Sequence, residues 1–393
     1  MNAPLLAPLD PHTPCLPQHP HGSRIEARIV RWSDWADEAQ IARWDALARA
    51  PSTPNPFFEA WYLLPALAAF DPAGTGRLLI VEAGEELIGL MPLAAPRRYG
   101  RWPLPHLATW LHPNAFLGAP LVKTGMEMPF WQAMLACLDA QGAHHGALFM
   151  HFPAMPLKER LVRSLFAHAR GEGRKAVLVM REERAMLQSA LGPDAYLEQA
   201  LTAKKRKELR RQHARLSELG NLVFERREDA QGVDDWIEAF LDLERKGWKG
   251  RSGSAMAGSP QTLALFRQSL GKAARIGRLE RLSLSLDGRP VAMLANFLTP
   301  PGSFSFKTAF DEDFARYSPG VLLQRENLGL LEREGIFWCD SCAAPDHPMI
   351  DSLWTERRAI GRISVAIGRP WRRGVFGLLS GLELARSPVG IAQ

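Results

Sequence analysis

The 393-residue sequence contains only four cysteines, Cys15, Cys137, Cys339 and Cys342. So few thiols in so long a chain argue against a disulfide framework of the kind that stabilises small secreted domains. They favour a reducing compartment, and we therefore expect a cytoplasmic protein.

The sequence also lacks a long apolar run and the features of a signal peptide. Its longest apolar stretch, residues 60–70, is interrupted by Pro65 and is well short of the roughly 18 residues that a membrane-spanning helix needs. The opening stretch MNAPLLAPLDPHTPCLPQHPHG is rich in Pro and His, without the basic start or the unbroken apolar core of a signal peptide. We expect no transmembrane helix, and a disordered tail over residues 1–23.

The composition is that of a globular protein, with 46% hydrophobic and 23% charged residues. A chain of this length suits two domains of ordinary size. The net charge of +6 and the pI near 9.3 are compatible with anionic partners such as phosphates, nucleic acid or acidic lipid, but do not choose among them.

The apolar pattern alternates between helical and strand-like spacing along the chain. In the first half it predicts a strand, two helices, a hairpin with an acidic turn, and then alternating helices and strands at 24–30, 32–50, 59–70, 76–96, 127–140, 147–152, 157–170 and 175–180. In the second half it predicts a long helical stretch from about 193, then a strand and two helices at 222–226, 233–246 and 262–276. This pattern indicates an α/β fold.

One pattern occurs twice. GRLERLSLSLDGRPVAMLANFLTP at 277–300 has the plan of GRLLIVEAGEELIGLMPLAAP at 76–96: Gly-Arg-Leu, a strand, an acidic turn with glycine, and a second strand that ends near proline. Each copy follows a helical pair, which suggests two copies of one unit. We expect domains at 24–185 and 186–365 with a seam near 181–194, and a basic, apolar tail at 366–393 that either packs as a terminal helix or rests on a membrane surface.

A strand-like run at 304–310 leads through DEDFARY into SPGVLLQRENL. Ser318 suits a helix N-cap, Pro319 suits the first turn, and Gly320 would let a ligand approach the backbone. The start of such a helix offers free N–H groups to an anion, although the same residues are favoured at any helix start.

Several segments in order, KKRKELRRQHARLSELG, LERKGWKGRSGSAM, LDGRPVAMLANF, FKTAFDEDFARYSPGVLL and DSCAAPDHPMIDSLWTERR, carry a family resemblance. Residues 200–358 resemble the acetyltransferase-like family associated with bacterial cellulose and exopolysaccharide biosynthesis, a branch of the GNAT superfamily related to the Fem-type transferases. The resemblance implies tandem GNAT-like units with mixed, mostly antiparallel sheets flanked by helices. It also implies that Tyr317, Ser318, Pro319, Gly320, Val321 and Leu322 hold the pyrophosphate of an acyl donor, although RYSPGV departs from the usual Arg/Gln-x-x-Gly-x-Gly/Ala loop.

The segment AKKRKELRRQHARL places seven cations on one expected helix: Lys204, Lys205, Arg206, Lys207, Arg210, Arg211 and Arg215. They either steer donor phosphates, lie on acidic lipid, or form an ordinary solvated face. The stretch has no interleaved aromatic residues, so we expect no specific nucleic-acid platform.

Other side chains are candidates for the acceptor pocket. In LERKGWKGRSGSAM these are Glu244, Trp248, Lys249 and Arg251; the alternative is a helix C-cap at Gly247 with Trp248 packed as a plug. Lys307 and Asp311 flank the strand before the helix start, and they either pair with each other or line the cleft.

The segment FWCDSCAAPDHPMID carries the candidates for proton transfer, Asp340 and His347. Cys339 and Cys342 form a CxxC without a second pair, so we expect no metal site. A nucleophilic Cys342 is the other possibility, but the neighbouring sequence contains no motif for the base that it would need. The alternative interpretation of Asp340 and His347 is that they are ordinary loop residues without a catalytic role.

Together these features lead us to expect a GNAT-type N- or O-acyltransferase that uses acyl-CoA and no permanently bound cofactor. Its acceptor would be an amine or a hydroxyl, with a possible place in cellulose or exopolysaccharide biosynthesis through peripheral association with a synthesis complex. Two alternatives stay open: a non-catalytic scaffold protein, and a Fem-type transferase that takes aminoacyl-tRNA.

Overall fold

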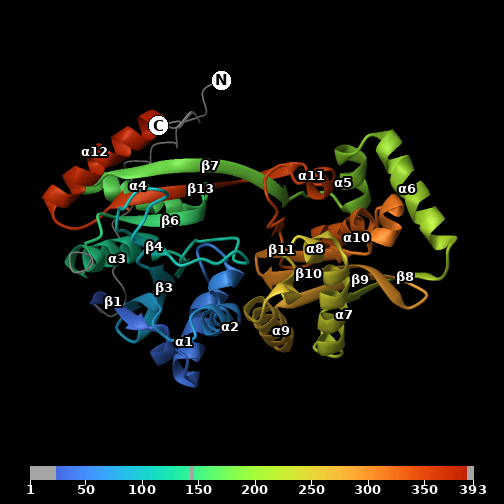
Figure 1. Cartoon of the computed structure of the whole chain (residues 1–393). Coiled ribbons are helices and arrows are strands. Elements are labelled where there is room, and N and C mark those ends of the chain that lie inside the picture. The colour runs from blue at the N-terminus through green and yellow to red at the C-terminus, as the bar shows by residue number, and fades with distance from the viewer. Residues whose placement is uncertain (1–23, 142–145, 387–393) are drawn as a thin grey trace. The chain divides into compact units, whose positions relative to one another are not determined.

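A computed structural model describes residues 24–141 and 146–386, so the N-terminal tail expected over residues 1–23 lies outside the described residues. The described chain forms two compact units (Figure 1). Within the described residues, the first unit contains 24–60, 73–141, 146–182 and 359–386, and the second contains 61–72 and 183–358. The domain boundaries expected at 185 and 365 assume that each domain is one continuous segment. In the structure, residues 61–72 belong to the second unit, and residues 359–386 belong to the first.

The first unit is an α/β sheet. Its strands are β1 (Ile25–Arg31), β2 (Arg77–Ala83), β3 (Glu86–Ala94), β4 (Leu107–Thr109), β5 (Leu121–Val122) and β6 (Phe149–Pro156), with parts of β7 (Ala176–Leu187) and β13 (Glu356–Ala366). Its helices are η1 (Trp32–Trp35), α1 (Glu38–Arg49), η2 (Pro56–Phe58), α3 (Glu127–Gln141), α4 (Arg160–Gly171) and α12 (Pro370–Arg386). The strand order is β1-β2-β3-β4-β6-β13-β7, and β5 pairs with β3.

The second unit repeats this plan. Its helices are α2 (Ala60–Phe70), α5 (Pro193–Ala200), α6 (Ala203–Ser217), α7 (Val233–Lys246), α8 (Trp248–Arg251), η4 (Met256–Gly258), α9 (Pro260–Arg275), η5 (Glu312–Tyr317), α10 (Pro319–Asn327), η6 (Leu328–Glu332) and α11 (Pro348–Asp351). Its own strands are β8 (Leu222–Arg227), β9 (Leu279–Leu286), β10 (Arg289–Thr299), β11 (Gly302–Phe310) and β12 (Trp338–Asp340). From β7 the order is β7-β12-β11-β10-β9-β8.

The two predicted hairpins are confirmed, β2-β3 and β9-β10. In the second, Leu286 pairs with Arg289 across a two-residue turn whose residues Asp287 and Gly288 both have positive φ, as a type I′ turn requires. The prediction of an α/β fold whose mixed sheets are flanked by helices is confirmed as well. The long helical stretch expected from 193 is two helices, because the chain turns at Leu201 and Thr202 before Thr202 caps α6.

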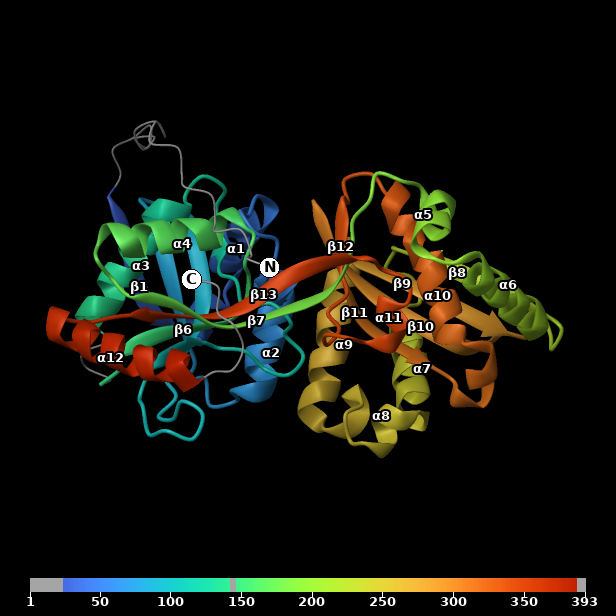
Figure 2. The same ribbon diagram turned by 90° about the horizontal axis from the view of Figure 1, so that it is seen from above.

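Strands β7 and β13 are exchanged between the two repeats. In chain order β7 follows β6 and β13 follows β12, yet β12 pairs with Met186 and Leu187 of β7, while β6 pairs with Ile360–Ala366 of β13. In Figure 2 the red β13 therefore runs beside the green strands β6 and β7, from a distant part of the sequence. The segment expected as a C-terminal tail supplies the end of β13 and the helix α12 to the first unit.

None of the helices within the described residues is both long and apolar enough to cross a membrane.

Candidate functional site

The candidate site begins where two parallel strands separate. β11 and β12 pair only over Gly302–Phe304 and Trp338–Asp340. β11 then continues to Phe310, whereas the chain after Asp340 turns toward β7, with Ser341 N–H donating to Ala185 O at 3.2 Å and Cys342 at φ 54°. We call the region between Ser305–Phe310 and Ser341–Cys342 the strand wedge. On the other edge of β11, a β-bulge interrupts the pairing with β10, because the register shifts between Ala295 and Asn296.

Lys307 projects from β11 at this bulge and is partly buried, with Nζ 5.6 Å from the centroid of the Phe306 ring. Burial, and next the ammonium of Lys249, lower the pKa of Lys307 to about 8, while Glu244 and Cys342 act in the opposite direction. Asp311 is not its partner: Asp311 pairs with Arg289 at 2.5 Å. Of the two readings of this pair, the structure favours Lys307 at the wedge and a separate ion pair for Asp311.

Glu244 and Lys249 lie together next to Lys307. Lys249 Nζ donates to Glu244 Oε1 at 3.0 Å and to Thr308 O of β11 at 2.8 Å. Glu244 is buried on α7, and its Oε2 accepts from Met256 N at 2.7 Å. This arrangement ties α7, α8 and η4 to the strand that carries Lys307.

A small pocket opens beside this pair. It is lined by Leu243, Glu244, Gly247, Trp248, Lys249, Ala309 and Phe310. Trp248 is 50% exposed, so it is not a packed plug, and Arg251 pairs with Glu312 at 2.5 Å. The structure thus brings Glu244, Trp248, Lys249 and Lys307 to one place, while Arg251 lies at its rim, bound to η5.

The start of α10 is more crowded than the sequence suggests. Ser318 stands at the N-cap position in a left-handed conformation, and its side chain does not cap the helix; Ser318 Oγ instead accepts from Gln212 Nε2 of α6 at 3.1 Å. A Cβ on Gly320 would lie 2.9 Å from Met349 Sδ, so a larger residue here would require the Met349 side chain to shift. Val321 and Leu322 N–H already donate to Ser318 O, which leaves the Gly320 N–H as the first-turn donor to which the described residues give no acceptor.

The basic helix α6 lies beside this helix start, as its bond to Ser318 shows. Lys205 and Arg206 are held by carbonyl groups of Ser352, Glu198 and Leu201. The remaining five cations are exposed: Lys204, Lys207, Arg210, Arg211 and Arg215. Positive charge therefore gathers next to the end of α10 where a helix dipole favours an anion.

Asp340 is fully buried between two guanidinium groups. Its Oδ2 accepts from Arg184 at 2.7 Å and from Arg358 at 2.9 Å, and its Oδ1 accepts from Cys342 N at 2.9 Å. Burial opposes ionisation, but the charges of Arg184 and Arg358 outweigh it and lower the pKa of Asp340. With both oxygens engaged, this carboxylate is suited to fixing the turn at Cys342 and poorly suited to accepting a proton.

His347 precedes α11 and is partly buried, and its Nδ1 has no hydrogen-bond partner among the described residues. The two cysteines of the CxxC are free and buried, and burial raises the pKa of both thiols. A thiol that resists ionisation is a weak nucleophile, which argues against covalent catalysis by Cys342.

Sequence reasoning missed Tyr62 on α2, a helix from the first half of the sequence that belongs to the second unit. Its buried ring packs edge-on against Phe297 at 5.7 Å and Phe306 at 5.9 Å. Burial, followed by the charge of Cys342, raises the pKa of Tyr62 well above its usual value. Lys307 and Tyr62 thus both interact with Cys342 at the wedge.

Sequence reasoning also missed a buried polar chain behind the wedge. Asn296 Nδ2 donates to Glu280 and to Asn327 Oδ1, each at 2.7 Å. Asn327 donates to Gln324 at 3.1 Å, and Gln324 donates to Thr308 Oγ1 at 3.4 Å. Polar residues inside the apolar runs VAMLANFL and VLLQRENLGLL were the available signal. This series of hydrogen-bonded side chains fixes α10 to β9, β10 and β11, the three central strands of the unit.

Comparison with known proteins agrees with this geometry. Residues 203–347, less than half of the chain, match the family model described as an acetyltransferase (GNAT) domain. The crystal structure of FemX is similar in fold, with a TM-score of 0.54 and 11% identity over 86% of this chain and 98% of FemX. The C-terminal domain of an Agrobacterium fabrum protein assigned as a lysylphosphatidylglycerol synthetase is similar at TM-score 0.52 and 15% identity, over 90% of this chain and 98% of that domain.

No curated protein matches the sequence. The matched residues run from the basic helix α6 through the strand wedge and α10 to His347. The second unit therefore carries the match to a GNAT acetyltransferase domain, and the fold of the chain is similar to that of FemX, as expected for GNAT-like units.

Proposed function

We propose that the second unit transfers an acyl group from a thioester, acyl-CoA, to an amine or hydroxyl acceptor. The observation that carries this proposal is the strand wedge: two parallel strands separate at Phe304 and Asp340, and just beyond this point β11 carries Lys307, whose lowered pKa reflects burial and whose charge interacts with Cys342. A separated strand pair offers backbone groups that can bind an extended donor and polarise its carbonyl.

Lys307 is the proton acceptor in this proposal. With a pKa of about 8, about a quarter of Lys307 is neutral at pH 7.5. The neutral amine takes the proton of the acceptor N–H or O–H while the acceptor attacks the thioester carbon. The C–S bond then breaks and the thiolate leaves. The ammonium formed on Lys307 holds the proton that the thiolate finally takes up. Tyr62, held protonated by burial, is suited to donate a hydrogen bond to the thiolate.

In this proposal the donor phosphates bind at the start of α10, beside α6. The amides of Val321 and Leu322 are engaged within the turn, so the exposed cations of α6 supply most of the charge. Arg211 and Arg215 flank Gln212, whose side chain contacts Ser318. The acceptor is placed in the pocket beside Trp248 and Glu244. The resemblance to the exopolysaccharide-associated family makes sugar amines and hydroxyls the first acceptors to test. The proposed reaction takes place in the cytoplasm.

A charged tRNA is the alternative donor, and the exposed cationic helix α6 is the observation that favours it. A scaffold without catalysis is the alternative that the crowded start of α10 favours, because Gly320 is packed against Met349. Steeply salt-dependent binding of tRNA by a protein that does not bind acyl-CoA would replace the proposed donor.

The test is calorimetric binding of acetyl-CoA, followed by turnover with amine and hydroxyl acceptors. Reversing two cations of α6 with Arg211→Glu/Arg215→Glu should weaken binding about tenfold or more. The matched variant Lys272→Glu/Arg275→Glu, two exposed cations on α9, should leave binding unchanged. Absence of binding by folded wild-type protein would overturn the acyl-CoA proposal, and equal losses in both variants would overturn the placement of the phosphates.

Catalysis is tested separately from binding. Lys307→Met keeps the length of the side chain and removes the amine, and we expect turnover to fall about 100-fold or more while acetyl-CoA still binds. His347→Ala tests the base expected from the sequence. If Lys307→Met kept full activity and His347→Ala lost it, His347 would be the proton acceptor in place of Lys307.

A further inference from the structure

The first unit exposes apolar side chains in one place. Among the described residues, ten large apolar side chains are exposed, and four of them belong to α12 and to one loop of this unit. On α12, Trp371 is 64% exposed, Val375 37% and Leu378 76%; in the loop, Trp102 is 49% exposed. Large exposed aromatic and aliphatic groups that gather on one surface mark an interaction site.

The three residues of α12 form a stripe opposite its docked side. At 100° per residue, Trp371, Val375 and Leu378 span only about 60° of the helix circumference. Phe376 and Ser380 lie on the other side and are buried. The helix therefore presents one apolar face to the unit and a second one away from it.

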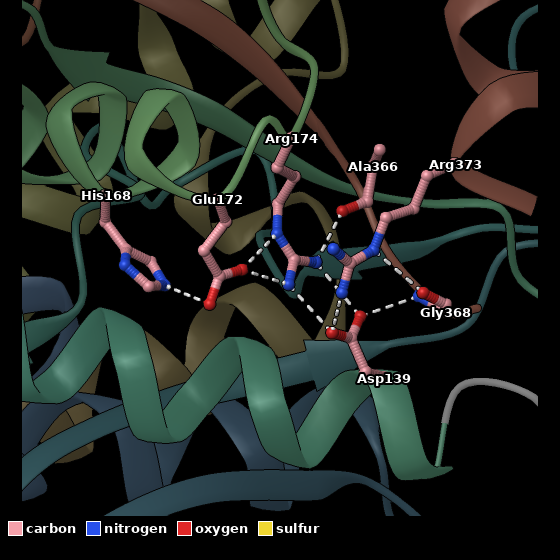
Figure 3. Close-up of polar contacts among 7 residues, drawn as sticks. All are labelled: Asp139, His168, Glu172, Arg174, Ala366, Gly368 and Arg373. Carbon is pink, nitrogen blue, oxygen red and sulfur yellow. Dashed lines mark hydrogen bonds and ion pairs between the residues drawn. The ribbon is translucent and has the colours of Figure 1, made fainter. Parts of the chain in front are cut away.

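The orientation of α12 is fixed by polar contacts, which Figure 3 shows. Arg373, on the docked side, pairs with Asp139 Oδ2, and its Nε donates to Gly368 O at 2.9 Å. Asp139 also accepts from Gly368 N at 2.7 Å and binds the buried Arg174 through both oxygens at 2.9 and 2.7 Å. With the Phe376 ring centroid 5.1 Å from that of Phe149 and the two rings tilted by 33°, these contacts hold the apolar stripe outward.

The loop with Trp102 belongs to the same surface. Tyr99 packs 5.2 Å from Phe149 and joins the small core cluster that contains Phe376. The loop thereby lies next to α12. Both exposed tryptophans carry an arginine over the ring, Arg101 on Trp102 and Arg372 on Trp371, each at 5.4 Å.

The charge of this surface has one sign. No Asp or Glu occurs between Leu87 and Met126 or between Arg357 and Leu382. Arg97, Arg98, Arg101 and Arg369 are exposed on these two segments. Asp139, which contacts α12 through Arg373, also binds Arg174, and Glu172 binds Arg174 as well. Tryptophan with aliphatic side chains and arginines, without carboxylates, is the composition that binds the headgroup region of an anionic bilayer.

We infer that this surface, α12 with the loop at 97–102, docks the protein on an anionic membrane surface. The stripe of Trp371, Val375 and Leu378 enters the headgroup layer together with Trp102, and the arginines face the lipid phosphates. Such docking is peripheral and needs no spanning helix. It involves the first unit only, so it stands or falls independently of acyl transfer in the second.

The test is cosedimentation of the full-length protein with vesicles of phosphatidylcholine alone or with 30% phosphatidylglycerol. We expect binding to the anionic vesicles that falls as salt rises. Trp371→Ser/Leu378→Ser should reduce the partition coefficient by about tenfold or more per residue, and Arg98→Gln/Arg101→Gln by about fivefold per residue. All four side chains are exposed, so the melting temperature should not change.

Two matched variants in the second unit serve as controls. Ile276→Ser/Phe337→Ser removes two apolar side chains that are 53% and 68% exposed, and Arg211→Gln/Arg215→Gln removes two exposed cations of α6; both should bind like wild type. The inference is overturned if wild-type protein does not bind, if it binds neutral vesicles equally well, or if the controls lose as much. A dimer in light scattering that Trp371→Ser/Leu378→Ser dissociates would instead assign the surface to a second copy of the chain.

Discussion

Replacing Lys307 by methionine should make the protein more stable while it removes activity. Folding lowers the pKa of Lys307 from 10.5 to about 8. The folded state thus holds this proton more weakly than the unfolded chain, and the unfolded chain binds more protons between pH 8 and 10.5. Stability of the wild type therefore rises with pH in this window, and below it the buried ammonium costs the folded state about 3 kcal/mol. Methionine keeps the aliphatic stem without that cost.

The magnitude should depend on pH. Relative to wild type, Lys307→Met should gain at most about 3 kcal/mol of unfolding free energy at pH 7 and about 1 kcal/mol at pH 10, where the wild-type amine is already neutral in the folded state. Urea unfolding at the two pH values measures the difference. Lys158→Met, which removes an exposed lysine just before α4, is the control and should change little at either pH. A variant that is less stable than wild type, or a gain that does not shrink with pH, would refute this account of the site.

The turnover of wild-type protein should rise with pH around an apparent pKa of about 8 as Lys307 loses its proton, and a pH–rate profile that is flat from 6.5 to 9 would count against Lys307 as the base. Asp340→Asn should lower the unfolding free energy by about 3–5 kcal/mol because it removes the buried negative charge that Arg184 and Arg358 both contact; Asp346→Asn, on an exposed side chain, is the control, and equal effects would contradict the assignment. Asp139→Asn should weaken the attachment of α12, seen as faster amide hydrogen exchange in residues 370–380 with little change in α9, whereas unchanged exchange would show that Phe376 alone holds the helix.

The secondary structure was predictable because its signals are local. Alternating apolar residues gave the two hairpins, and Asp287-Gly288 supplied the turn chemistry between β9 and β10. From the sequence, we expect Gly320 to let a ligand approach the backbone. In the structure Met349 packs against Gly320, and the sequence does not show this contact. Asp340 looked like a base in sequence, and only the structure shows the two arginines that surround it, one of them 156 positions earlier in the chain.

The parts that could not be predicted depend on contacts between distant segments. Tyr62 lies in the first half of the sequence but packs on Phe297 and Phe306. The lowered pKa of Lys307 depends on burial and on Lys249, which no spacing rule reports. The acceptor pocket beside Glu244 was suggested by the glycine-rich loop that carries Trp248, Lys249 and Arg251, together with the family resemblance.

The exchanged strands have a consequence for synthesis of the protein. β13 lies between β6 and β7 in the first unit, so the ribosome must translate residues 360–366 before that sheet can close. The first unit is begun first and finished last, although domains usually fold in the order in which they are made. Until then the apolar edge of β6, including Phe149 and Phe152, waits for its neighbour, and a nascent chain stalled within the second unit would leave a binding site for chaperones.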